Sequence, residues 1–197
     1  MAKKRALRAD AERNREHVLK VAQDVFAAEG LAVPIDEIAR RAGLGVGTLY
    51  RHFPTKEALF LAIVVDRMEH LVAEARALAT APDPGEAFFG FLSRMIHERS
   101  AKRDFMDALS GSGADLGRTL AAIKASYRAA LAVVLQRAQD CGAVRRDVSV
   151  REVHALVTGT FGALDQLGKD AAQARRRLLA IVCDGLRPPQ GAVDASK

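Results

Sequence analysis

Residues 36–53 read Asp-Glu-Ile-Ala-Arg-Arg-Ala-Gly-Leu-Gly-Val-Gly-Thr-Leu-Tyr-Arg-His-Phe, and this stretch decides the fold of the first part of the chain. Apolar Ile38 and Ala39 lie on one face of a first short helix, which Gly43 ends. Small Ala39 permits a close crossing, and Leu49 of a second short helix can pack back against it. Two short helices joined by a glycine-bearing turn predict a helix-turn-helix unit.

The start of the second short helix suits contact with an anion. Gly45 and Gly47 let the backbone approach a phosphate or a base edge closely. The free N–H groups and the positive end of the helix dipole also favour a negative partner. Donors without excess bulk follow on this helix and just beyond it: Thr48, Tyr50, His52 and Lys56. We therefore expect this helix to lie in the major groove of DNA, held in register by phosphate contacts.

The rest of the chain has the spacing of helices, with apolar residues every three or four positions and no alternation typical of strands. Helix starts are marked by capping residues: Asp83 with Glu86, Ser149 with Glu152, Asp170 with Gln173, and Thr55 alone. These patterns predict an all-α protein of about nine helices. The expected ranges are 10–29, 36–42, 47–53, 56–80, 84–101, 103–109, 116–141, 150–167 and 171–185.

The same pattern suggests how the chain is divided. We expect a helix-turn-helix DNA-binding domain over residues 1–55 and a second helical domain over residues 56–187. Residues 110–115 (Ser-Gly-Ser-Gly-Ala-Asp) predict a flexible break, and 188–197 a flexible tail.

Charge is unevenly distributed along the chain. The formal net charge is +6, and residues 1–20 carry seven basic against three acidic side chains. A basic end favours a polyanionic partner, and a merely solvated tail is the alternative. With 49% hydrophobic and 27% charged residues, the composition is that of an ordinary globular protein.

Several other classes of protein find no support in the sequence. Cys141 and Cys183 form neither a disulfide framework nor a zinc pattern, and no histidines pair at ligand spacing. No nucleophile elbow, phosphate-binding loop after a strand or His-Glu-x-x-His motif occurs, so we expect no enzyme, cofactor or metal. No apolar run is long enough for a membrane span or a signal peptide, and we expect a cytoplasmic protein.

The run from Ile35 to Leu59 resembles the DNA-binding segment of the TetR (tetracycline repressor) family. The likeness is strongest in Gly-Thr-Leu-Tyr-Arg-His-Phe at 47–53, followed by Pro-Thr-Lys-Glu-Ala-Leu at 54–59. One position departs from the family, because Pro34 stands where a capping Thr is usual, which leaves Asp36 or water to satisfy the first amides. Two later stretches, 84–95 and 139–145, resemble one regulator subgroup of the same family.

The resemblance implies a role for each matching residue. Base edges would be met by Val46, Gly47 and Arg51, and phosphates by Tyr50, His52 and Lys56. Thr48 would contact the DNA backbone or a base. The remaining candidates are Arg40, Arg41 and Gly45, which lie at the end of the first helix and in the turn. The partner would be operator double-stranded DNA, bound by a repressor that a small-molecule effector releases.

An aromatic and methionine-rich cluster in the second half has two interpretations, the wall of an apolar effector pocket or an ordinary core. Its candidate residues are Phe88, Phe91, Leu92, Met95, Phe105, Met106, Leu109, Tyr127 and Phe161. The family resemblance also implies that residues 56–187 form an effector-binding and dimerisation domain, with a homodimer formed through the last two helices. Its candidate interface residues are Val153, Leu156, Val157, Thr160, Phe161, Leu164, Leu178, Leu179, Ile181 and Val182.

Other functions stay open at this point. The helix-turn-helix unit can serve a helical interaction protein that binds something other than an operator. Within regulation, a ligand-blind repressor or an activator is the alternative. The sequence identifies neither the effector nor the operator.

Overall fold

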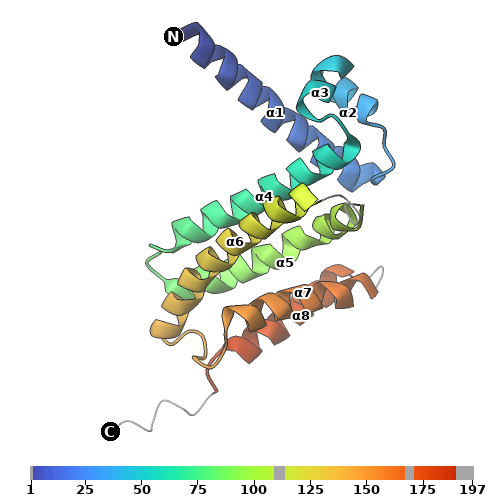
Figure 1. Cartoon of the computed structure of the whole chain (residues 1–197). Helices are drawn as coiled ribbons and strands as arrows, with labels where there is room; N and C mark the ends of the chain where they lie inside the picture. Colours follow the sequence, from blue (N-terminus) through green and yellow to red (C-terminus); the bar gives the residue numbers. More distant parts are fainter. Residues whose placement is uncertain (1, 109–113, 167–170, 190–197) are drawn as a thin grey trace. The chain divides into compact units, whose positions relative to one another are not determined.

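The computed structural model describes residues 2–108, 114–166 and 171–189, with side chains at 13–96, 117–160 and 173–189. All the regular structure in these ranges is helical, so the predicted all-α fold is confirmed (Figure 1). The helices are α1 (Ala2–Glu29), α2 (Ile35–Arg41), α3 (Val46–His52), α4 (Lys56–Leu78), α5 (Pro84–Ala108), α6 (Ala114–Asp140), α7 (Val150–Gln166) and α8 (Ala171–Leu186).

Two helices differ from the expected ranges by more than two residues, and the ends of the other helices agree with the expectation to within two residues. The helix expected over 10–29 begins at Ala2, because residues 2–9 are mostly alanine, lysine and arginine, which favour helix. The two helices expected over 84–101 and 103–109 form the single helix α5. The segment between them contains neither glycine nor proline, so nothing interrupts the backbone hydrogen bonds.

The expected helix caps are present wherever the structure describes them. The amide of Ala58 donates to Thr55 Oγ1 over 3.1 Å, and that of Glu86 to Asp83 Oδ1 over 2.9 Å. Ser149 and Glu152 form a reciprocal pair, since the amide of Ser149 donates to the Glu152 carboxylate and the amide of Glu152 to the Ser149 hydroxyl. Asp170 lies outside the described residues.

The chain divides into two compact units. We call residues 1–67 and 101–117 the N-terminal unit, and residues 68–100 and 118–197 the C-terminal unit. Helix α4 contributes residues to both of them.

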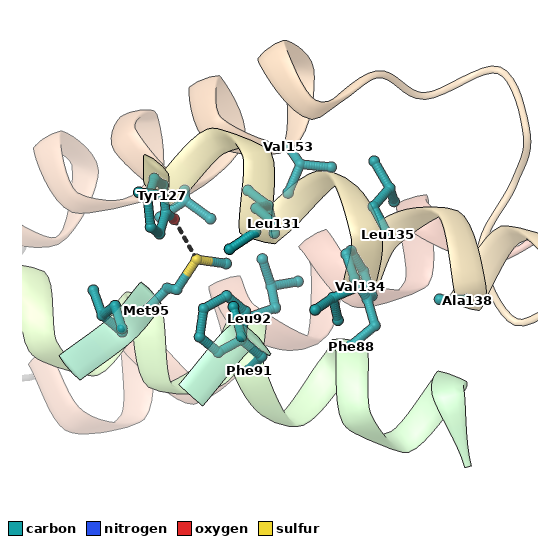
Figure 2. Close-up of a cluster of buried hydrophobic side chains, with 14 of the residues drawn as sticks. Phe88, Phe91, Leu92, Met95, Tyr127, Leu131, Val134, Leu135, Ala138 and Val153 are labelled. Carbon is teal, nitrogen blue, oxygen red and sulfur yellow. Dashed lines mark hydrogen bonds between the residues drawn. The ribbon is translucent and has the colours of Figure 1, made fainter. Parts of the chain in front are cut away.

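The core of the C-terminal unit is built from α4, α5, α6, α7 and the end of α8. Phe88, Phe91, Leu92, Leu131 and Val153 are all fully buried in it. Figure 2 shows Phe88, Phe91 and Leu92 of α5 on the side that faces Leu131 of α6. Apolar burial of this kind stabilises the unit and holds α4 against α5 and α6.

Candidate nucleic-acid interface

The turn between α2 and α3 has the backbone that a helix-turn-helix unit needs. Gly43 has φ +67°, a left-handed conformation that side-chain-bearing residues rarely adopt. The amide of Leu44 donates to the Ala39 carbonyl over 3.0 Å, which closes the end of α2. Gly45 precedes α3 with extended backbone, at φ −65° and ψ 138°. The predicted turn is therefore confirmed, with α3 starting one residue earlier than expected.

Apolar side chains hold α2 and α3 together in the N-terminal unit. Ile38, Ala39 and Leu49 are each completely buried, as the sequence predicted. Phe53, directly after α3, is also buried and lies under the guanidinium of Arg15 from α1, 5.2 Å from the ring centroid. This packing fixes one face of α3 and leaves the opposite face outside.

The outer face of α3 is exposed and carries no acidic residue. Val46 is 41% exposed and Tyr50 42% exposed, and Arg51 is exposed as well. Thr48 and His52 are half-buried at its edges. This face offers an apolar side chain, a phenol and a guanidinium, which are groups that can contact base edges and phosphates.

Open space surrounds the two glycines at the start of α3. A Cβ atom placed on Gly47 would meet nothing within 4 Å, and one on Gly45 would meet only Thr48 Oγ1 at 3.9 Å. Glycine destabilises a helix relative to alanine, so its presence calls for a reason. Packing within the protein does not require glycine at position 47. Gly45 precedes α3 at the N-cap position, where glycine is well tolerated.

Two of the expected phosphate-contacting side chains have partners in the unbound protein. Desolvation, together with the charge and hydrogen bond of Asp36, raises the pKa of Tyr50, so its hydroxyl stays a donor at neutral pH. The ammonium of Lys56 lies 5.9 Å from the ring centroid of Phe26 and 5.8 Å from that of Phe60. These rings hold the lysine beside α3 and leave its N–H donors available.

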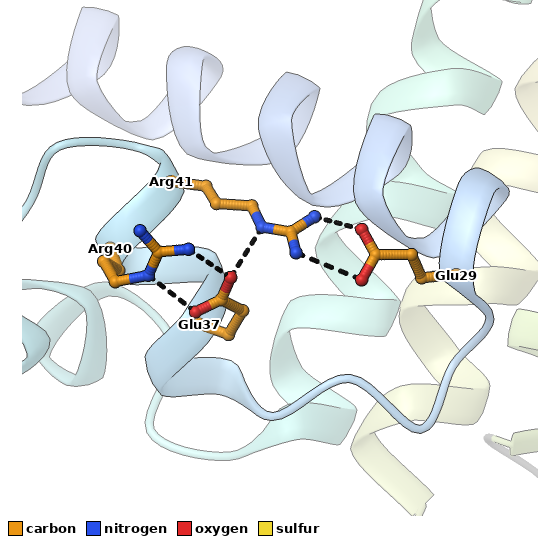
Figure 3. Close-up of polar contacts among 4 residues, drawn as sticks. All are labelled: Glu29, Glu37, Arg40 and Arg41. Carbon is orange, nitrogen blue, oxygen red and sulfur yellow. Dashed lines mark hydrogen bonds and ion pairs between the residues drawn. The ribbon is translucent and has the colours of Figure 1, made fainter.

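The two arginines at the end of α2 make ion pairs that sequence analysis did not foresee. Arg40 Nε donates to Glu37 over 2.7 Å, and Arg41 Nε donates to the same carboxylate over 2.7 Å (Figure 3). Arg41 also reaches Glu29, the last residue of α1. The spacing of Glu37 to both arginines is a visible signal, but no local pattern links Arg41 to a residue twelve positions earlier.

Helix α2 begins at Ile35, directly after Pro34 and one residue earlier than expected. No side chain caps α2, and the amide of Glu37 instead donates to the Pro34 carbonyl over 3.1 Å.

The candidate effector residues whose side chains the structure describes belong to the core of the C-terminal unit. Phe88, Phe91 and Leu92 are fully buried, and the Tyr127 hydroxyl donates to the sulfur of Met95 (Figure 2). In this conformation they pack against one another. The remaining candidates, Phe105, Met106, Leu109 and Phe161, lie outside the described side chains.

The candidate dimer residues with described side chains are buried, exposed or half-buried. Val153, Val157 and Thr160 are buried within the chain itself, whereas Leu156 is 42% and Ile181 58% exposed. Leu178, Leu179 and Val182 are half-buried against the core, and Phe161 and Leu164 lie outside the described side chains. An outward apolar face on α7 and α8 is thus carried by Leu156 and Ile181.

Neither a metal-binding cluster nor a membrane-spanning helix is present among the described residues. They contain no group of three or more His, Cys, Asp or Glu side chains placed to hold a metal ion. None of their helices combines the length and apolar character needed to cross a membrane.

Two family descriptions match successive parts of the chain. Residues 18–63 match bacterial regulatory proteins of the tetR family. Residues 83–188 match the C-terminal domain described as transcriptional regulator SbtR-like. The first match contains the whole of α2 and α3.

Whole-chain relatives agree with these matches. A TetR transcription regulatory protein from Mycobacterium vanbaalenii is 46% identical, with a TM-score of 0.74 over 92% of this chain and 99% of that one. The TetR transcriptional regulator SCO0520 from Streptomyces coelicolor is 34% identical, with a TM-score of 0.73 over 89% and 99%. The HTH-type transcriptional regulator UidR from Escherichia coli K12 is 25% identical over 183 residues, which are 86% of this chain and 91% of UidR.

Proposed function

The chain belongs to the tetR family of bacterial regulatory proteins, and from this premise we propose how this DNA-binding regulator works. It binds a near-palindromic operator as a homodimer, represses transcription, and is released by a small-molecule effector. It acts by binding and not by catalysis. The observation that carries the proposal is the exposed, acid-free face of α3 with open space at Gly47.

Each part of α3 has a distinct task in this proposal. Val46, Gly47 and Arg51 meet base edges, where an arginine can pair with a guanine through two hydrogen bonds. Tyr50 and His52 donate to phosphates, joined by Lys56 from the start of α4, and these contacts position the helix without reading sequence. Gly45 and Thr48 lie at the N-terminus of α3, where the backbone comes closest to the duplex in this proposal.

Dimerisation and effector binding belong to residues 56–187 in this proposal, with 1–55 for DNA binding and 188–197 as a tail. Exposed Leu156 and Ile181 support a second copy packing on α7 and α8. The effector enters the aromatic core between α5 and α6, where apolar side chains and the Tyr127 hydroxyl suit a mostly apolar ligand.

Selection of bound duplexes from a random pool tests the proposal. We expect symmetric half-sites about 10 base pairs or slightly more apart, read in successive major grooves. Arg51→Ala should relax discrimination at one base position by about 1–3 kcal/mol, whereas His52→Ala should weaken all duplexes alike. Enrichment of no duplex would contradict operator binding and favour a protein-interaction role. Repeating the selection with a small-molecule panel tests release.

A further inference from the structure

Adjacent arginines at the end of α2 have unequal surroundings. The side chain of Arg40 is 72% exposed, whereas that of Arg41 is 32% exposed. Arg40 pairs with one carboxylate among the described residues, that of Glu37, from its own helix. Arg41 lies between two carboxylates from different helices, Glu29 of α1 and Glu37 of α2 (Figure 3). Arg40 is therefore the more exposed of the two arginines, and Arg41 is the one held by two helices.

From this difference we propose that Arg41 is a positioning residue for DNA recognition. It acts through Glu29 and Glu37 by tying α2 to the end of α1, while Arg40 is the arginine that meets the DNA backbone. The inference rests on the operator binding proposed above. It changes the role of Arg41 from the direct contact that the sequence suggested.

The geometry of the tie is that of a two-pronged clamp. Arg41 Nε donates to Glu37 Oε1 over 2.7 Å, and its two terminal nitrogens donate to the two oxygens of Glu29, one of them over 3.0 Å. A planar guanidinium that faces a carboxylate in this way fixes orientation as well as distance. Gly30, with φ +83°, turns the chain directly after Glu29, so the clamp closes the connection from α1 to α2.

Charge also argues against a phosphate contact by Arg41. Glu29, Glu37, Arg40 and Arg41 together form a neutral cluster, so Arg41 must give up a carboxylate partner before its positive charge can face a phosphate. Hydrogen bonds from Arg40 and then Arg41 lower the pKa of Glu37 to about 2, and Arg41 lowers that of Glu29. Both carboxylates are hence ionised at neutral pH and keep Arg41 engaged.

The position of α2 matters because α3 is packed against it. Ile38 and Ala39 of α2 and Leu49 of α3 are all fully buried, so the two helices move as one body. A shift of α2 relative to α1 would therefore turn the exposed face of α3. A base contact depends on orientation, and it is lost more readily than general attraction to phosphates.

Glu29→Gln gives a test with opposite outcomes for the two roles. It removes a negative charge on the DNA-binding unit, so if Arg41 contacts phosphate, the substitution frees Arg41 and tightens binding. If Arg41 positions α2, affinity for the selected operator falls at least fivefold, about the loss of one base contact. Affinity for a random duplex does not fall in that case, because the loss of a negative charge favours attraction to any phosphate backbone. Tighter operator binding by Glu29→Gln would overturn the proposal.

The salt dependence of binding separates the two arginines. Each phosphate contact contributes about 0.9 to the slope of log affinity against log salt. Because both protomers of the proposed homodimer carry the substitution, Arg40→Gln should reduce the magnitude of the slope by about 1.8, whereas Arg41→Gln should leave it unchanged while weakening the operator complex. A lowered slope for Arg41→Gln would overturn the positioning role. Wild-type protein that selects no duplex would instead refute the proposed function itself.

Exchanging the charges of Glu29 and Arg41 provides a third test of the positioning role. Glu29→Arg/Arg41→Glu keeps the net charge and lets an arginine on α1 reach carboxylates on α2. We expect the double variant to bind the operator more tightly than Arg41→Glu does. This gain in affinity should exceed any change that Glu29→Arg causes in the wild-type protein. Purely additive effects in this cycle would show that the two side chains do not act together. Thermal unfolding of each variant verifies that it is folded.

Discussion

Gly47→Ala should make the protein more stable and a weaker DNA binder at the same time. Gly47 is the second residue of α3, and a Cβ there meets no atom within 4 Å in the free protein. Alanine therefore fits without strain and restricts the unfolded chain more than glycine does. We expect the free energy of unfolding to rise by about 0.5–1 kcal/mol. For a chain of this size that raises Tm by about 1–4 °C.

The effect on DNA binding has the opposite sign. If the backbone at Gly47 lies against a base edge, the new methyl group occupies the space that the base needs. The helix must then withdraw and lose at least one base contact, which costs about 1–3 kcal/mol. In a homodimer both recognition helices carry the substitution, so the total is about 2–6 kcal/mol, or at least a 30-fold loss of operator affinity.

Gly117→Ala is the matched control for this experiment. Gly117 is an exposed glycine in α6, and its Cβ would also meet nothing within 4 Å. The control should gain similar stability and leave operator affinity unchanged. Chemical denaturation and fluorescence anisotropy with the selected duplex measure the two quantities. Operator affinity of Gly47→Ala equal to that of the control would refute the close approach of DNA to α3.

Three further substitutions test other parts of the structure. Gly43→Ala should lower the free energy of unfolding by about 1 kcal/mol in urea titration, because φ +67° disfavours any Cβ; unchanged stability would contradict that turn. The pKa of Glu37 lies at about 2, below its ordinary 4.5, so its ion pairs stabilise the fold fully above pH 4.5 and are lost as pH falls towards 2. Glu37→Gln should flatten that part of a Tm profile against pH, and an identical profile would speak against the pairs. Ile181→Glu, at a 58% exposed position, should yield folded monomers in sedimentation, whereas a dimer of normal affinity would exclude this face.

The DNA-binding unit could be predicted from sequence because its signals are local. The conformation of Gly43 and the burial of Ile38, Ala39 and Leu49 depend on residues within one short segment. Spacing, a helix breaker and a small residue at the crossing are enough to specify such a unit. The family resemblance, now confirmed, rests on the same segment.

Features that depend on residues far apart in the sequence, or on small differences in helix propensity, could not be predicted from the sequence. The break expected near residue 102 does not occur, because the end of a helix without a breaker is decided by small differences in propensity. The pair between Arg41 and Glu29 forms only once Gly30 has turned the chain back. Both arginines had therefore looked equally available for DNA.

The complete burial of the aromatic core bears on how an effector could act. A ligand among Phe88, Phe91 and Leu92 must displace side chains that now fill the space, so binding would shift α5 against α6. Such a shift would also displace the end of helix α4, because Arg137 of α6 donates to the carbonyl of Leu78, the last residue of α4, over 3.0 Å and to that of Ala81 over 2.8 Å. The same helix begins in the N-terminal unit at Lys56, directly after the recognition helix. By linkage, an effector that favours the shifted arrangement by about 1–3 kcal/mol would weaken operator binding about five- to 150-fold, and DNA would weaken effector binding equally.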